Sequence, residues 1–168
     1  MDKISYIYNT EIGKFQIIEE SGVIIGVNFN TDTNIREQES KLIRTTYLQI
    51  KEYLQEKRKE FDIPIKMYGT EFQKKVWKEL QKIPYGETRS YKQIAENIGN
   101  SKACRAVGMA NHNNPIAIII PCHRVIGTND KLVGYAGGID IKQKLLNLEK
   151  NWNILDKHTQ VMISYIST

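Results

Sequence analysis

The chain has 168 residues, of which 40% are hydrophobic and 26% are charged, and its formal net charge is +5. This composition supports a folded core of one or two domains and excludes wholesale disorder, and no apolar run approaches the roughly 18 residues that a membrane span needs. The first residues, MDKISYIYNT, lack the apolar segment of a secretory signal, so we expect a soluble, cytoplasmic protein.

The N-terminal part has the pattern of a small sheet with one helix. Lys14–Glu20 and Val23–Phe29 are rich in Ile, Val and Phe and are separated by Ser21-Gly22, which predicts a β-hairpin. The segment Lys3–Tyr8 predicts a third strand. Apolar residues recur at helical spacing from Asn34 to Arg58, which predicts one long amphipathic helix over this sheet.

A linker and a change of charge divide the chain. The segment Phe61-Asp62-Ile63-Pro64-Ile65 breaks the helical pattern, so we predict a scaffold domain over residues 1–65 and a second domain over residues 66–168. Residues 1–65 contain 9 Lys and Arg against 11 Asp and Glu, whereas residues 66–168 contain 15 against 8. The positive second domain indicates a polyanionic partner such as nucleic acid, although a basic surface also serves solubility alone.

Three helices are predicted early in the second domain. Thr70 is a suitable N-cap for a helix that ends before Pro84-Tyr85-Gly86. Ser90 caps a short helix, and Gly99-Asn100-Ser101 then turns the chain into another helix, Lys102–Asn111. Two short helices joined by a tight turn fit a helix-turn-helix motif, and an ordinary helical hairpin is the alternative.

The rest of the domain combines an apolar run, a turn and a final helix. Pro115–Ile120 predicts a buried strand that leads into Pro121-Cys122-His123-Arg124-Val125. A glycine-rich loop follows at Gly134–Gly138, and Ile139–Lys150 predicts the final helix. The expected class is therefore α/β (α+β), with a small N-terminal sheet plus helix followed by a mostly helical C-terminal domain.

Cys122 is the candidate nucleophile. A free thiol has a pKa near 8.5, so only about 3% of it is thiolate at neutral pH, and a neighbour must lower that pKa or remove the proton. His123 and Arg124 are such neighbours, but adjacent side chains on a strand point apart, so His123 serves Cys122 only if the turn bends them together or a water bridges them. Glu149 is the candidate carboxylate that orients the imidazole, with a solvated helix charge as the alternative.

The other Cys and His residues lack such a pattern. Cys104 alternates with small residues on a predicted helix, where we expect it to be structural. His112 and His158 have no partner at metal-ligand spacing, so we expect ordinary surface residues. With two cysteines in all, and neither Cys nor His before Cys104, the sequence predicts no zinc site, no disulfide framework and no cofactor.

Several motifs between about residues 70 and 150 resemble one family. The chain is similar there to the O6-alkylguanine-DNA alkyltransferases, or methylated-DNA-protein-cysteine methyltransferases, in Asn114-Pro115-Ile116, Ile120–Val125, Gly134-Tyr135-Ala136-Gly137-Gly138, Pro84–Thr88, Ser90-Tyr91, Arg105–Gly108 and Leu145-Leu146 before Glu149. The N-terminal part is similar in length and layout only. The resemblance implies a ribonuclease H-like layout there and a winged helix-turn-helix-like DNA-binding motif in the C-terminal domain.

The resemblance also implies an activity. A monomer would repair double-stranded DNA by moving an alkyl group from O6 of guanine, and less readily from O4 of thymine, onto Cys122, once and irreversibly. His123 would act as the base through a water, and Glu149 would hold His123. Asn114 would brace the turn, and Tyr91 would donate a hydrogen bond to the departing guanine.

On the DNA side, the resemblance implies that the damaged base leaves the helix and that Arg105 fills the gap. Other DNA contacts are expected at Ser90, Arg89, Lys102 and Ala103. The alkyl pocket would be lined by Tyr135, Ala136, Gly137, Val125 and Pro121. Ala136 stands where some relatives have a hydroxyl residue, so hydrogen bonds to O6 would come from backbone N–H groups.

Two other function classes remain open. A cysteine hydrolase would use Cys122, His123 and Glu149 for acyl transfer, but it leaves Arg105 and the positive domain unused. A non-catalytic DNA-binding module would sense alkylated bases or regulate transcription, and the presence of Cys122 argues against it.

Overall fold

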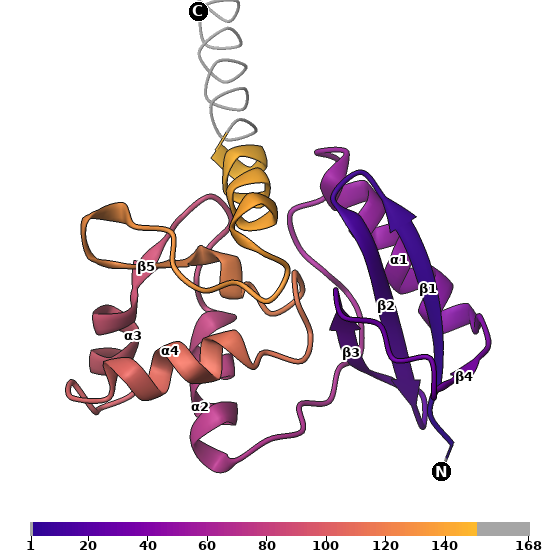
Figure 1. Cartoon of the computed structure of the whole chain (residues 1–168), viewed down its shortest axis with the longest axis horizontal. Coiled ribbons are helices and arrows are strands. Elements are labelled where there is room, and N and C mark those ends of the chain that lie inside the picture. Colours follow the sequence, from indigo (N-terminus) through magenta and orange to yellow (C-terminus); the bar gives the residue numbers. More distant parts are fainter. Residues whose placement is uncertain (1, 151–168) are drawn as a thin grey trace, which may run out of the picture.

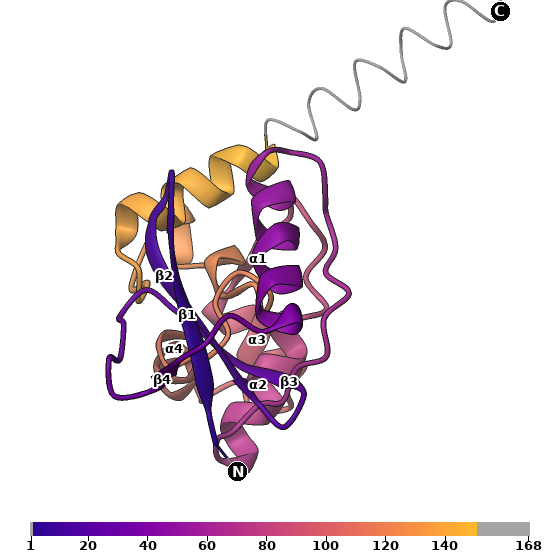
Figure 2. The ribbon, with the colours of Figure 1, turned by 90° about the vertical axis from the view of Figure 1, so that its right-hand side faces the viewer.

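The computed structural model describes residues 2–150 of the chain (Figure 1). A four-stranded sheet and helix α1 form one side of the molecule, and helices α2, α3 and α4 form the other (Figure 1). The last helix, described over residues 139–150, crosses the end of the molecule at which α1 ends (Figure 2). No helix within this described range is long and apolar enough to span a membrane. His158 lies outside it.

The sheet has the strand order β3-β2-β1-β4. Strands β1 (Ile4–Thr10) and β3 (Val23–Asn28) both pair antiparallel with β2 (Gly13–Glu20), which confirms the predicted hairpin and third strand. Ser21 and Gly22 have φ angles of 53° and 79°, and two successive left-handed residues give a turn whose twist matches that of the strands. One core unites the buried face of this sheet with α1 through Phe15, Ile17, Ile24, Val27, Ile43 and Ile50.

Helix α1 spans Lys41–Leu54, so the prediction of a helix from Asn34 to Arg58 is wrong at both ends. Arg36–Glu37 instead form β4, which runs parallel to β1. Ser40 begins the helix, because its side chain accepts a hydrogen bond from a backbone N–H three residues later. After the helix, Glu56 has a φ of 58°, which ends the helical path.

The edge of β3 pairs with two segments, one before α2 in the sequence and one after it. The linker forms a parallel bridge at Ile24, and the segment before the cysteine turn forms another between Ile116 and Val27. The prediction of a strand over Pro115–Ile120 is wrong, because this run makes single bridges and turns sharply at Ile118, which has a φ of 72°. Four of its apolar residues are buried, namely Ile116, Ala117, Ile118 and Ile120, and burial alone gives the same sequence pattern as a buried strand.

The predicted helices of the second half are present as α2 (Glu71–Leu80), α3 (Tyr91–Asn97) and α4 (Cys104–His112). Thr70 and Ser90 begin α2 and α3 with capping boxes, in which each hydroxyl accepts a hydrogen bond from a backbone N–H and a Gln side chain returns one. The caps therefore fix where both helices start, as the sequence indicates.

Helices α3 and α4 meet in the predicted helix-turn-helix arrangement. Gly99 turns the chain between them with a φ of 83°, and Trp77 Nε1 of α2 donates to the carbonyl of Ala110 in α4 at 2.8 Å. A two-stranded parallel ribbon, β5 (Arg89–Ser90) with β6 (Val125–Ile126), ties the start of α3 to the cysteine turn. The α+β class is confirmed, whereas the domain boundary after residue 65 stays a prediction.

Candidate active site

Cys122 opens a single 3-10 turn, Cys122–Arg124, and is only 4% exposed. The end of α4 and the residues after it brace this turn. Asn111 Nδ2 donates to the carbonyl of Cys122 at 3.3 Å, and Asn114 Nδ2 donates to the carbonyl of Ile120 at 2.8 Å. Two side-chain amides therefore hold the backbone at and just before the turn that carries the sulfur.

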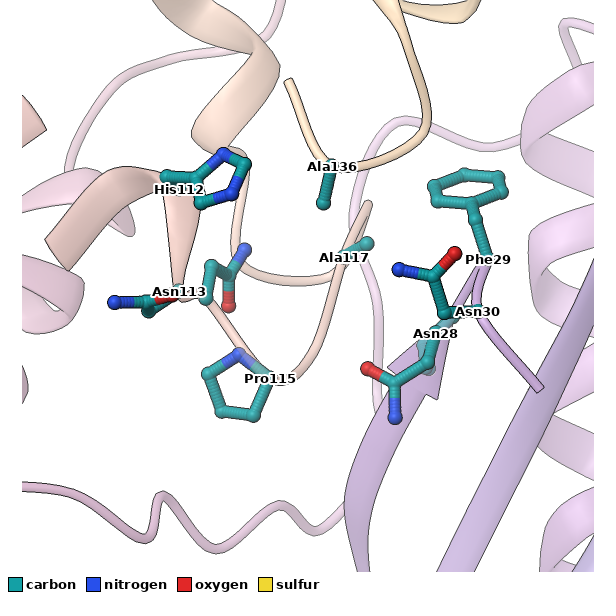
Figure 3. Close-up of a pocket in the computed structure, with 10 residues that line it drawn as sticks. Asn28, Phe29, Asn30, His112, Asn113, Pro115, Ala117 and Ala136 are labelled. Atoms are coloured by element: carbon teal, nitrogen blue, oxygen red, sulfur yellow. The ribbon is translucent and has the colours of Figure 1, made fainter. Parts of the chain in front are cut away.

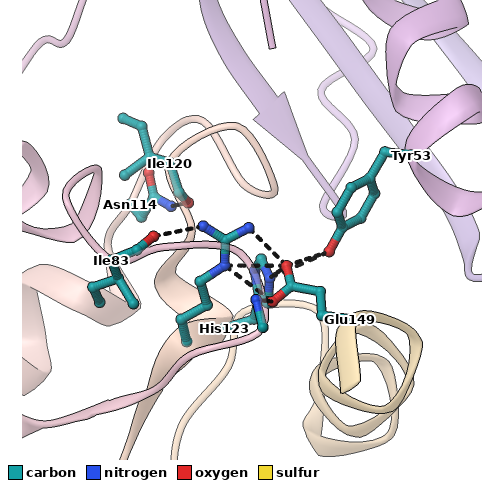
Figure 4. Close-up of polar contacts among 8 residues, drawn as sticks. Tyr53, Ile83, Asn114, Ile120, His123 and Glu149 are labelled. Carbon is teal, nitrogen blue, oxygen red and sulfur yellow. Dashed lines mark hydrogen bonds and ion pairs between the residues drawn. The ribbon is translucent and has the colours of Figure 1, made fainter. Parts of the chain in front are cut away.

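His123 and Glu149 form a buried pair, here called the His-Glu relay (Figure 4). The His123 Nε2 atom lies 2.8 Å from Glu149 Oε1, and the side chains are 0% and 1% exposed. Glu149 also accepts hydrogen bonds from Arg124 Nε and Nη2, at 3.0 and 2.8 Å, and from the backbone N–H of Gly86 at 3.2 Å. Glu149 is therefore not the solvated helix charge that the sequence left open.

The protonation states of the relay follow from these contacts. Burial alone would raise the pKa of Glu149, but hydrogen bonds from His123 and Arg124, together with the positive charge of the guanidinium, outweigh it and hold that pKa at about 2. Burial lowers the pKa of His123, against the opposing effect of Glu149. A neutral imidazole beside a carboxylate carries its proton on the facing atom, Nε2. The other atom, Nδ1, is then a bare acceptor, and it has no hydrogen-bond partner in the part of the chain that the structure describes.

The cysteine is held as a thiol. Burial raises the pKa of Cys122 to about 11, although a hydrogen bond from Asn114 and the charge of Lys142 lower it. A resting thiolate is therefore disfavoured at neutral pH. Of the two routes to a nucleophile, removal of the proton during the reaction is the one that this geometry supports, with His123 Nδ1 as the free acceptor.

Tyr91 and Arg105 lie on the helix-turn-helix side of the site. They line a cavity of about 400 Å³ together with Cys104, Gly108, Val133 and Gly134. Arg105 is exposed, and the half-buried Tyr91 donates its hydroxyl to the carbonyl of Val133 at 3.0 Å. Burial raises the pKa of Tyr91, and its electrostatic coupling to Cys122 adds to that shift.

Comparison with known proteins shows where this site belongs. Residues 71–151 match the family model described as 6-O-methylguanine DNA methyltransferase, DNA binding domain, and residues 4–67 match the model of the ribonuclease-like domain of the same proteins. The chain belongs to the 6-O-methylguanine DNA methyltransferase family. The methylated-DNA--protein-cysteine methyltransferase of Methanosarcina acetivorans is 57% identical over 112 residues, which cover 67% of this chain and 72% of that protein.

Solved structures of this family are similar over most of the chain. The O6-methylguanine methyltransferase of Mycobacterium tuberculosis is 41% identical with a TM-score of 0.83, over 89% of this chain and 93% of that one. The structure of the OGT of the same organism in complex with DNA is also 41% identical, with a TM-score of 0.84 over 89% of this chain and 94% of that one.

The other DNA-side residues that the family resemblance indicated lie at the start of α3 and α4. Ser90 uses its hydroxyl to accept from the backbone N–H of Gln93 as the α3 cap, and Arg89 donates to the carbonyl of Thr88. Lys102 is exposed. Two further residues are half-buried and pack against the core, namely Ala103 and Cys104.

The residues expected around the alkyl group do not all share one cavity. Ala136 lines a cavity of about 330 Å³ with Asn114, Phe29 and Asn28 (Figure 3). Tyr135 and Val125 are buried, and Gly137 lies against the ring of Phe29. Pro121 instead lines a cavity of about 590 Å³ with Tyr85, Arg124 and residues of the linker. His112, at the end of α4, is exposed as predicted.

Two further residues of the site were not predicted from the sequence. Tyr53 of α1 donates its hydroxyl to Glu149 Oε1 at 2.8 Å. Lys142 is 0% exposed, and its Nζ donates to the carbonyls of Val125 at 2.6 Å and Val133 at 3.1 Å, so it ties both ends of the loop after the cysteine turn. Its position three residues before buried Leu145 and seven before Glu149 is a signal that would have placed it on the inner face of the last helix.

No group of three or more His, Cys, Asp or Glu side chains in the described range has a geometry that could hold a metal ion.

Proposed function

We propose that this protein repairs double-stranded DNA by transferring an alkyl group from O6 of guanine, and less readily from O4 of thymine, to the sulfur of Cys122. The family membership and the names of its relatives support this activity. The observation that carries the assignment to Cys122 is the buried His-Glu relay directly after it, with an unpaired acceptor at His123 Nδ1.

The reaction proceeds as an in-line displacement. The Cys122 proton passes through a bridging water to His123 Nδ1 while the sulfur attacks the alkyl carbon. The bond from that carbon to O6 breaks, and its electron pair goes to the guanine, which accepts a proton from the Tyr91 hydroxyl. His123 then returns the thiol proton to Tyr91 through solvent, so the net change is a thioether on Cys122 and an unmodified guanine.

DNA binding prepares this step. The O6 atom is inaccessible in the base stack, so the base is extruded at a cost of a few kcal/mol, and Arg105 fills the gap. Since the Tyr91 hydroxyl is engaged with Val133, the incoming base must replace that carbonyl as its partner. Phosphate contacts from Lys102 and Arg89 make binding salt-dependent and largely independent of sequence.

The protein acts once, because a thioether is a poor leaving group and the alkyl group therefore stays on Cys122. The proposed reaction uses no cofactor. We further propose that it acts as a cytoplasmic monomer on DNA containing O6-alkylguanine, without a membrane partner.

Intact-protein mass spectrometry after exposure to O6-methylguanine duplex tests the proposal. One CH2 equivalent is expected per molecule, located on Cys122 by peptide mapping, and further substrate adds none. Cys104→Ser should gain the same mass, and Cys122→Ser should not. Repeated removal of methyl groups from the DNA by one protein molecule would favour a cysteine hydrolase. Binding of the DNA without any transfer would favour a non-catalytic module. Either result overturns the proposal.

A further inference from the structure

A tyrosine from the sheet-and-helix side of the molecule reaches into the His-Glu relay. Tyr53 lies on α1, is 0% exposed, and donates its hydroxyl to Glu149 Oε1 at 2.8 Å (Figure 4). The same hydroxyl lies 3.3 Å from His123 Nε2. The ring is packed edge-on against both His123 and Tyr85, with centroids 6.5 and 6.1 Å away. Its place among these groups is therefore fixed from several sides.

The direction of the hydrogen bond follows from charge. Glu149 is ionised, because its pKa is held at about 2, so its oxygens only accept and the Tyr53 hydroxyl must donate. Oxygen Oε1 thus receives three donors at 2.8 Å, which are Tyr53 Oη, His123 Nε2 and Arg124 Nη2. Donors that share one oxygen divide its negative charge, so each weakens the pull on the others.

We propose that Tyr53 is a positioning residue for alkyl transfer: its hydroxyl shares Glu149 Oε1 with His123 and so keeps the imidazole neutral, with its proton on Nε2 and Nδ1 free. This inference rests on the proposed function and deepens it. The N-terminal part, which the sequence presented as a scaffold, then supplies a side chain that tunes the base of the reaction.

Charged groups from two segments of the described part of the chain act on His123, and the buried Tyr135 lies close enough to Glu149 and Cys122 to interact with both electrostatically. The C-terminal helix brings Glu149, which favours the imidazolium, and Lys142, which opposes it. Arg124, next along the 3-10 turn, also opposes it, and Cys122 begins that turn. Tyr53 from α1 packs its ring against His123, and Tyr85 from the loop before β5 packs against the other side of Tyr53. Removing one donor from Glu149 therefore leaves Glu149 stronger as the partner of His123.

Tyr53→Phe keeps the buried ring and removes only the hydroxyl. Because Glu149 then attracts the imidazole proton more strongly, the pKa of His123 rises, and we expect a shift of about one unit. An imidazolium has no acceptor at Nδ1, so the acid limb of the pH–rate profile moves to higher pH. A shift of one unit predicts an about fivefold loss of rate at the pH where wild-type His123 is half protonated, fading to near parity two pH units higher.

The test combines NMR titration of His123 with the single-turnover rate on free O6-benzylguanine across pH. Tyr47→Phe is the matched control, because Tyr47 lies on the same helix but stacks on Tyr8 with ring centroids 3.9 Å apart. Tyr47→Phe is expected to reproduce the wild-type titration and profile. NMR of the wild type should also show the proton on Nε2, and this measurement does not depend on the folding of any variant.

Three results would overturn the inference: an unchanged His123 pKa in Tyr53→Phe, a loss of rate that is equal at every pH, or a wild-type proton on Nδ1. An equal loss would mark a purely structural role, since a smaller folded fraction lowers all rates together. A wild-type protein without any transfer would instead refute the proposed function, and the NMR titration would still decide whether Tyr53 tunes His123.

Discussion

Phe29, directly after β3, and Gly137 in the glycine-rich loop are in direct contact across the two sides of the molecule. A methyl group on Gly137 would lie 2.8 Å from Cδ2 of the Phe29 ring, closer than side-chain carbons approach. The same ring lies 5.9 Å from the ring of Tyr135, centroid to centroid. The sheet therefore supports the loop that we expect to line the alkyl pocket.

This contact predicts that Gly137→Ala displaces the loop and slows alkyl transfer by about tenfold, in line with the 1–3 kcal/mol that overpacking costs. Phe29→Ala removes the opposing ring, so the double variant should recover most of the rate that Gly137→Ala loses. The measurement is the single-turnover rate on free O6-benzylguanine for all four members of the cycle. Losses that simply add would show that the contact does not position the loop.

Arg105 is exposed on α4, so Arg105→Ala should leave the fold intact. Extruding the base costs a few kcal/mol, and an Arg105 side chain that fills the gap offsets part of that cost. Its loss should therefore slow transfer from duplex DNA by about tenfold or more. Reaction with free O6-benzylguanine needs no extrusion and should change little. Lys102→Ala is the comparison, since losing one phosphate contact should lower the salt slope of binding by about 1. Equal losses on both substrates for Arg105→Ala would contradict base extrusion.

Helix starts were predictable where a capping residue stands directly before an apolar pattern. Thr70 and Ser90 do so, and α2 and α3 begin after them. Ser40 also caps a helix, but a polar stretch without periodic apolar residues precedes it, and the preceding Ile35 extended the apparent helix backward. The run Pro115–Ile120 was misassigned because burial between two layers leaves no periodicity that separates a strand from an irregular segment.

The site was predictable to the extent that its residues form local motifs. Cys122 and His123 are neighbours in sequence, and Glu149 follows a leucine pair on a helix. Tyr53 is 70 residues from His123 and 96 from Glu149, and a tyrosine in a helical apolar stripe has the same pattern whether it packs or donates a hydrogen bond. Long-range contacts of this kind are fixed by the docking of α1 on the helical part, which no local pattern encodes.

Because Lys142 is buried, we expect the stability of the fold to rise with pH in the alkaline range. Burial lowers the pKa of Lys142 from 10.5 to about 8, so between these values the folded state binds fewer protons than the unfolded state and stability rises with pH. The raised pKa of Cys122 acts in the opposite direction above about 9, so the effect is best measured in Cys122→Ser. In that background, the urea midpoint should rise from pH 8 to 9.5. Adding Lys142→Met should abolish the rise, whereas Lys144→Met, on the exposed face of the same helix, should keep it.

Because Glu149 is ionised in the fold, we expect the stability of the fold to fall in acid. Its pKa is about 2 in the fold against 4.5 for the free side chain, so the stability that it contributes is present above pH 4.5 and is lost as pH falls toward 2. The loss is on the order of 3 kcal/mol. Glu149→Gln should remove the part of the acid dependence that Glu149 contributes, because an amide does not titrate, and should leave the part below pH 6.5 that the lowered pKa of His123 contributes.

The same variant should be less stable at neutral pH as well. Arg124 would stay buried without its charged partner, a change that costs about 3–5 kcal/mol in other buried pairs. Glu79→Gln is the control, since the ion pair of Glu79 with Lys82 is partly open to solvent, with side chains 13% and 73% exposed, and should contribute less than about 1 kcal/mol. Urea denaturation from pH 7 to pH 3 measures both effects. A Glu149→Gln protein as stable as the wild type at pH 7 would show that Arg124 finds other partners and that the buried pair does not hold the last helix against the cysteine turn.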